Sequence, residues 1–304
     1  MGAEFLQLDL PALLAAALAG MTCGLLGSFL LLRRESLLGD AISHAVLPGI
    51  VLGFAATGVR SGWPMLVGAT LAAMTATVLI GWLRRVARLE GGAATGIVFT
   101  GFFALGLVLL EATGAREVDL DVDCVLFGQI ESLVWLEAVG WHSLLDPVAL
   151  GGLPRQLGLL AAVAGAALLF VFAAWRPLLL LCFDPAWAAV QGWRVRGLEA
   201  ALNLLVAAAA VAAFEAVGSI LVVAMLVCPA AALRMLAPRY AGQVWGGAAL
   251  GAAIGVAGVL VAGTIPAALG AGTSVSASGM IGTLGGVAVL LAALLRRGGA
   301  LRPA

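Results

Sequence analysis

The sequence contains no lysine and little charge of either sign. All 16 basic residues are arginine, and charged residues make up only 11% of the chain. A nucleotide-binding loop of the Walker type needs a lysine to reach the phosphates, so the sequence excludes such a loop. If ATP drives this protein, another chain must hydrolyse it. With 16 acidic residues the net charge is zero, which removes the electrostatic case for binding nucleic acid.

Paired cysteines and long polar stretches are also lacking. The four cysteines are scattered and do not show the paired spacing of metal clusters or redox motifs. No long polar segment separates the apolar ones. We therefore expect a single membrane domain over residues 1–304, without a soluble ATPase or regulatory domain and without a permanently bound cofactor.

Apolar residues dominate what is present. They make up 63% of the chain, and the mean hydropathy is +1.13, too high for a surface that faces water. Apolar runs of about 20 residues, the length that crosses a bilayer as a helix, recur along the whole sequence. Because these runs are continuous and do not alternate with period two, they indicate helices and not a barrel. The predicted fold class is an all-α polytopic membrane protein embedded in lipid.

Breaks at arginine, proline and glycine clusters predict nine spans, with an error of one. The expected spans are 10–32, 36–57, 63–83, 95–113, 157–181, 198–215, 219–236, 242–262 and 276–295. The runs 198–215 and 219–236 are so close that they form either a tight hairpin or a broken helix pair. The stretch 116–154 is less apolar, and we interpret it as an external or re-entrant segment.

The arginines predict the orientation, because basic residues near span ends are retained in the cytoplasm. With the amino terminus outside and the carboxyl terminus cytoplasmic, 13 arginines fall in internal loops and only three, Arg60, Arg116 and Arg155, fall outside. An acidic run between Glu117 and Asp123 then lies outside. It either draws cations toward an entrance or is simply a solvated loop.

Two ionisable side chains, Asp40 and His44, lie within the expected second span. Placing a carboxylate in a span costs about 3 kcal/mol, so such residues usually face a bundle interior or an aqueous path. Residues four apart share one helix face and are about 6 Å apart along the axis. At that spacing a carboxylate oxygen and a ring nitrogen can bind the same metal ion.

Two side chains do not complete a coordination shell. If two copies or two homologues met on a two-fold axis, two aspartates and two histidines would surround one ion. Such a set suits manganese, zinc or iron(II), and the absence of a nearby thiolate disfavours copper(I). The structural alternative is that Asp40 and His44 pair with each other or bridge helices.

Pro48 and Gly49 follow one turn after His44. Proline cannot donate a backbone hydrogen bond, so Pro48 should free the carbonyl of His44 and bend the span. A bent helix beside polar groups suits a moving gate. Ordinary packing explains the same residues, since proline and glycine are common in membrane helices.

The segment 184–196 predicts a short helix in an internal loop. Asp184 is placed to cap it, Pro185 begins its first turn and Gly192 follows its end. The helix either inserts into a cleft on a soluble partner or anchors the loop at the membrane interface through its two tryptophans.

Three of these segments resemble the permease subunits of zinc, manganese and iron ABC importers, the ABC-3 family, and the resemblance covers nearly the whole chain. The densest match is GDAISHAVLPG at residues 39–49, preceded by LRRES at 32–36. Residues 183–192 are similar to the family's coupling helix, which docks on the ATPase. Residues 119–128, DLDVDCVLFG, are more similar to the manganese and iron branch than to the zinc branch.

The resemblance implies a type II importer permease fold with about 8–9 spans in the bacterial plasma membrane. It implies as partners two ATPase subunits, a second permease copy or homologue, and a periplasmic or extracellular binding protein that delivers the metal. The channel metal site falls on Asp40 and His44. Docking on the ATPase is expected through Asp184, Pro185, Ala188 and Gly192.

The predicted function is that of the membrane-spanning subunit of an ATP-driven importer of a divalent metal ion, manganese before iron or zinc. The chain itself is not an enzyme, and the ion is its cargo. One alternative is a proton-coupled secondary metal transporter in which Asp40 and His44 relay protons. Another is a membrane scaffold that does not transport.

Overall fold

The computed structural model describes residues 4–57, 62–113, 130–138, 140–268 and 275–297. Within these residues the regular elements are helices, without a β-strand, and eight helices are long and apolar enough to cross a membrane. They are α2 (Leu10–Leu32), α3 (Leu37–Thr57), α4 (Gly62–Val86), α5 (Gly91–Ala112), α8 (Arg155–Ala173), α11 (Val195–Val217), α13 (Tyr240–Ala268) and α14 (Ala277–Arg297). A π-helical turn, η1 (Phe5–Asp9), extends α2 at its start. The prediction of an all-helical, multi-pass membrane protein is confirmed.

The expected spans correspond to these helices with two differences. The run 219–236 forms α12 (Ser219–Leu236), whose apolar part is shorter than the other spans. The run 157–181 was wrong as one span, because the chain breaks at Ala174 between α8 and α9 (Trp175–Phe183). Pro177, in the first turn of α9, cannot donate to the carbonyl of Ala173, so one hydrogen bond of a continuous helix would be missing at this break.

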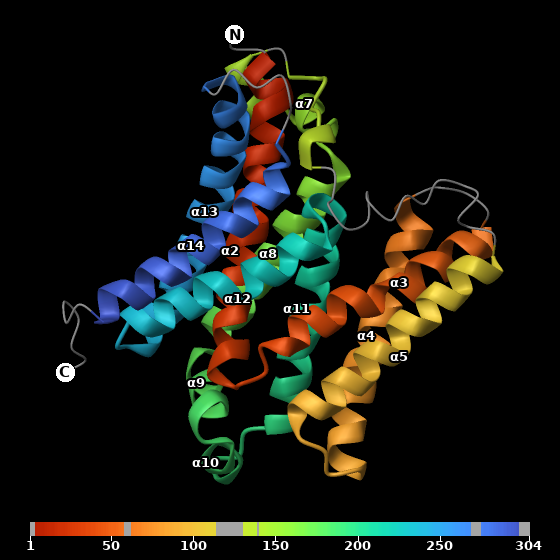
Figure 1. Cartoon of the computed structure of the whole chain (residues 1–304), viewed down its shortest axis with the longest axis vertical. Coiled ribbons are helices and arrows are strands. Elements are labelled where there is room, and N and C mark those ends of the chain that lie inside the picture. The colour runs from red at the N-terminus through yellow and green to blue at the C-terminus, as the bar shows by residue number, and fades with distance from the viewer. Residues whose placement is uncertain (1–3, 58–61, 114–129, 139, 269–274, 298–304) are drawn as a thin grey trace.

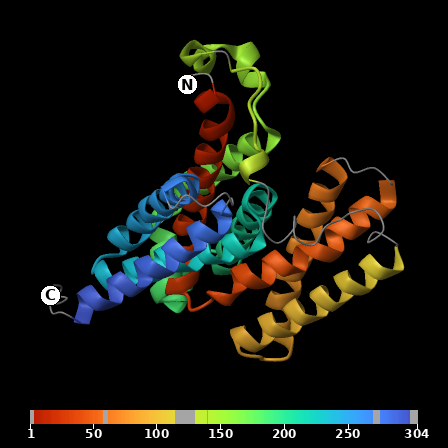
Figure 2. The ribbon, with the colours of Figure 1, turned by 45° about the horizontal axis from the view of Figure 1, so that its top comes forward.

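The helices form two groups (Figures 1 and 2). Helices α3, α4 and α5 pack on one another and stand beside the rest of the bundle; we call them the three-helix group. In the remainder, α2 lies along α13, with α8 and α11 against it, and α12 packs on α14. Helix α11 contacts both α3 and α4, and α12 contacts α3. These contacts join the three-helix group to the bundle.

Glycines allow α2 and α13 to approach closely. Gly20 faces Gly251, and Gly24 faces Gly247, so that backbone lies directly on backbone. A Cβ atom at Gly24 would overlap the carbonyl oxygen of Gly247. Small residues commonly serve this purpose in membranes, where association depends on van der Waals contact because lipid is as apolar as the side chains.

We expect Gly24→Ala to lower the stability of the folded chain by about 2 kcal/mol, because the methyl group must push two backbones apart. Thermal unfolding of the detergent-purified protein measures this. Gly165→Ala on α8 is the control, since a Cβ there meets open space. Equal unfolding temperatures for the two variants would show that the α2–α13 contact does not need glycine.

The turn between α11 and α12 occurs at a single residue, Gly218. Its φ of 85° lies in the left-handed region that glycine tolerates, and its N–H donates to the carbonyl of Phe214 at 3.0 Å. The predicted runs 198–215 and 219–236 are therefore two separate helices, α11 and α12, joined by a one-residue turn.

Residues 130–154 cover the amino-terminal end of α2. They form η3 (Ile130–Ser132), η4 (Trp141–Leu145) and α7 (Pro147–Gly151). Trp135 is buried there, donating its indole N–H to the carbonyl of Ala149 at 2.7 Å and its backbone N–H to that of Gln7 at 2.9 Å. None of these described elements is long enough to span a membrane.

Candidate functional site

Asp40 and His44 lie together on the first two turns of α3. The His44 Nε2 atom is 3.5 Å from Oδ1 of Asp40, and the side chains are 29% and 39% exposed respectively. The side chains of Leu38, Ala41 and Ile42 on the same helix are buried. The pair thus lies on a face of α3 that the chain leaves partly uncovered, with the ring nitrogen and the carboxylate oxygen close to each other.

The pair stands alone as a ligand set within the part of the chain that the structure describes. No group of three or more His, Cys, Asp or Glu side chains able to hold a metal occurs among those residues. The neighbouring Ser43 hydroxyl is engaged, because it donates to the carbonyl of Gly39 at 2.9 Å. Among the described residues, this face of α3 therefore offers one carboxylate and one imidazole. The same short distance also permits the structural alternative, a pairing of the two residues.

Two phenylalanines of α5 contact the imidazole. The ring centroids of Phe99 and Phe103 lie 5.1 and 5.7 Å from that of His44, with interplanar angles of 67° and 87°. The phenyl rings stack on each other at 6.2 Å. The sequence analysis missed both residues, because apolar side chains on an apolar helix carry no signal of their own.

Pro48 and Gly49 have packing partners within the three-helix group. Helix α3 runs on through Pro48, whose ring lies against Gly106 of α5. Gly49 meets Gly68 of α4 so closely that a Cβ on either residue would overlap the other's carbonyl oxygen. These contacts give both residues a structural role, and a role in gating stays a prediction.

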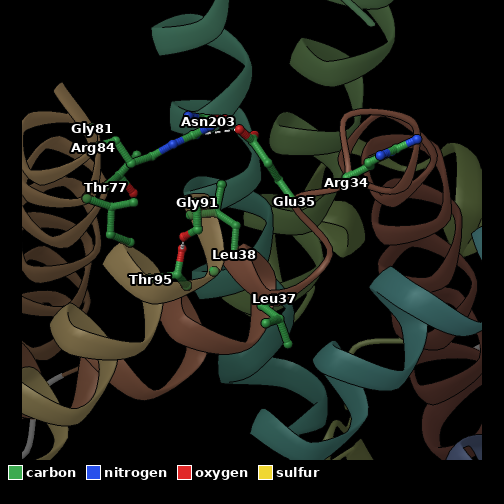
Figure 3. Close-up of a pocket in the computed structure, with 12 residues that line it drawn as sticks. Arg34, Glu35, Leu37, Leu38, Thr77, Gly81, Arg84, Gly91, Thr95 and Asn203 are labelled. Carbon is green, nitrogen blue, oxygen red and sulfur yellow. Dashed lines mark hydrogen bonds and ion pairs between the residues drawn. The ribbon is translucent and has the colours of Figure 1, made fainter. Parts of the chain in front are cut away.

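At the end of the bundle where α10 (Pro185–Val190) lies, called the α10 end, four charged side chains meet. Arg33 is 3.2 Å from Glu35 and 3.0 Å from Glu199 of α11, and Arg84 of α4 also contacts Glu35. Figure 3 shows Arg84 reaching toward Glu35 beside Asn203 of α11, at a pocket that Thr77 and Thr95 also line. This four-residue cluster links α2, α3, α4 and α11.

A left-handed residue places Glu35 in this cluster. Arg34 has a φ of 60°, and the next N–H, that of Glu35, donates back to the carbonyl of Leu30 at 2.8 Å. This turn ends α2 in the pattern usually made by glycine. It brings the Glu35 carboxylate beneath α2 just before α3 begins.

The short helix expected from segment 184–196 is present as α10. The Asp184 carboxylate accepts a hydrogen bond from the backbone N–H of Trp187 at 2.9 Å, and Pro185 is the first helical residue. Gly192 follows with a φ of 85°. The capping prediction is confirmed.

Of the four residues expected to contact the ATPase, three lie on the exposed surface around α10 and one does not. Asp184, Pro185 and Gly192 are exposed, whereas Ala188 is buried at 1% exposure and holds α10 against its own chain. Trp187 and Val190, at 52% and 77% exposure, present the apolar surface instead.

The motif at 119–128, which resembles the manganese and iron branch, falls outside the described residues.

Comparisons with known proteins agree on one family. The ABC 3 transport family matches residues 4–139 and 149–290. The manganese transport system membrane protein MntC of Halalkalibacterium halodurans is 36% identical over 82% of this chain and 76% of its own length. The Bacillus subtilis protein of the same name is 34% identical over 86% of this chain, which spans only 57% of that relative.

A solved structure supports the same conclusion. The structure of PsaBC from Streptococcus pneumoniae in complex with Fab matches with a TM-score of 0.72 and 28% identity, over 93% of this chain and 90% of the other. The match therefore includes both the three-helix group and the rest of the bundle. Fold, motifs and relatives together show that this chain belongs to the ABC 3 transport family.

Proposed function

We propose that this chain is the membrane-spanning subunit of an ATP-driven importer of divalent transition-metal ions, with manganese the first candidate, then iron and zinc. The observation that carries the proposal is the 3.5 Å approach of Asp40 and His44 on a partly exposed face of α3. Oxygen and imidazole nitrogen suit these metals. Two of the relatives are named manganese transport system membrane proteins, which favours manganese within this set.

A second permease, identical or homologous, would complete the shell. Both side chains are partly exposed, so a partner facing α3 across a two-fold axis would add a second carboxylate and a second imidazole. Ligands divided between two chains come apart when the chains move. This suits an ion that must be held only moderately so that it can leave.

Helix α10 is the proposed docking site for the ATPase subunit. It is capped, short and held to its own chain by buried Ala188, while Trp187 and Val190 project outward. An external binding protein would deliver the ion at the opposite end of the bundle. The orientation that follows places the amino terminus outside and the α10 end in the cytoplasm of a bacterial plasma membrane.

Reconstitution tests this function. We expect proteoliposomes that hold the permease with its ATPase to take up manganese, given the binding protein, only when ATP is present. Vanadate should block uptake and a protonophore should leave it unchanged. Uptake that is independent of ATP and abolished by the protonophore would instead support the proton-relay alternative. The family membership does not favour that alternative.

A further inference from the structure

Within the described parts of the chain, the second ring nitrogen of His44 has no carboxylate or carbonyl partner. A metal-binding histidine commonly donates its second ring N–H to a carboxylate, a carbonyl or a water molecule, which fixes the ring and strengthens the ligand. Among the described residues, the polar contact of His44 is Asp40, through Nε2, and its aromatic contacts are the rings of Phe99 and Phe103.

Two phenyl rings instead lie against the imidazole. They come from one helix, α5, four residues apart, and both meet the imidazole edge to face. Such pairs are favourable because the positive edge of one ring faces the negative face of the other. Rotation of a histidine ring about its last torsion is otherwise broad and roughly two-fold. Two aromatic neighbours at different angles restrict it.

The restricted orientation is the one that metal binding needs. With the ring held against α5, Nε2 faces the Asp40 carboxylate at 3.5 Å. A ring turned over would present carbon where nitrogen is required. An aromatic neighbour orients the ring without the added basicity that a carboxylate would give, which keeps binding weak enough for release.

We propose that Phe99 and Phe103 are positioning residues for the transported ion: they hold His44 in its ligating orientation and so set the affinity of the site. This positioning role rests on the proposed function, since it concerns the affinity of the same Asp40–His44 site for the ion. The aromatic rings contact the imidazole and carry no atom that ligates a metal ion. Their loss should therefore weaken binding of the ion without preventing its passage.

The test compares manganese uptake by reconstituted complexes that carry the wild-type chain, Phe99→Leu, Phe103→Leu or both substitutions. Leucine keeps an apolar side chain and removes the ring. We expect KM for manganese to rise about threefold in each single variant and about tenfold in the double variant, with maximal rate changed less than twofold. Phe103→Tyr keeps the ring and should restore the wild-type KM.

Phe102→Leu is the matched control, because this neighbour on α5 packs on the core and is not among the rings that contact His44. It should keep the wild-type KM. A merely structural role for Phe99 and Phe103 would lower the amount of folded complex or the maximal rate and leave KM unchanged, which would overturn the proposal. If the double variant does not fold, the two single variants decide by the same measure.

The wild-type complex separates the two levels of inference. A wild-type complex that transports neither manganese, iron nor zinc would overturn the proposed function, and the positioning role with it. A wild-type complex that transports while Phe99→Leu and Phe103→Leu keep its KM overturns the positioning role alone.

Discussion

Asp40→Asn and His44→Gln should each lower metal uptake by more than about 100-fold, because each removes one of the two proposed ligands, and loss of a residue that merely supports a ligand already costs 10- to 100-fold. Both substitutions keep approximate size and remove the group proposed to bind the ion. The measurement is cellular manganese, iron and zinc by mass spectrometry, in a deletion strain complemented with each variant and grown with limiting metal.

The chain supplies its own controls for this experiment. His142 is the other of the two histidines and is exposed on η4, and Asp9 is an exposed aspartate at the start of α2. His142→Gln and Asp9→Asn should leave metal content at the wild-type level. The double variant of Asp40 and His44 should be no worse than either single variant, since both losses affect one ion. Wild-type metal content in the Asp40→Asn and His44→Gln strains would contradict the metal site.

The spans were predictable because the bilayer fixes their length and composition independently of how helices pack. The runs 10–32 and 219–236 coincide with α2 and α12, and the others, apart from 157–181, agree with their helices within about six residues at each end. Hydropathy failed at 157–181 because the mean hydropathy of an apolar stretch is nearly the same whether it forms one helix or two helices with Pro177 at the break. Helix pairing was beyond reach for a related reason: the spans are apolar on most faces, so periodicity does not show which face meets which neighbour.

In the candidate site, too, features set by local spacing could be predicted and features set by the packing of distant helices could not. Asp40 and His44 are one turn apart on one helix, and Asp184 caps the helix that follows it, so local spacing sufficed for both. Phe99 and Glu199 reach their partners from other helices, far along the chain. Only the fold brings them together. Burial of Ala188 is likewise a property of the fold, since its neighbours on α10 are exposed.

The second large effect is expected at the four-residue cluster of the α10 end. Arg33 and Glu35 are only 6% and 9% exposed, and with Arg84 and Glu199 they balance two positive charges with two negative ones. Glu35 contacts both arginines. Without it the guanidinium of Arg33 would stay buried with only the more exposed Glu199 beside it, and Arg84 would lose its carboxylate.

Glu35→Ala should therefore lower the free energy of unfolding by about 3 kcal/mol, the typical cost of leaving a buried charge without its partner. Glu199→Ala should cost less than about 1 kcal/mol, because Glu199 is 40% exposed and water replaces it in part. Thermal unfolding in detergent, followed by tryptophan fluorescence, ranks the variants. The control is Glu90→Ala, at an exposed glutamate just before α5. Equal unfolding temperatures for Glu35→Ala and Glu90→Ala would show that the cluster does not stabilise the junction of α2, α3, α4 and α11. An unfolding temperature for Glu35→Ala well below those of Glu199→Ala and Glu90→Ala would show that the buried pair holds the three-helix group to the bundle.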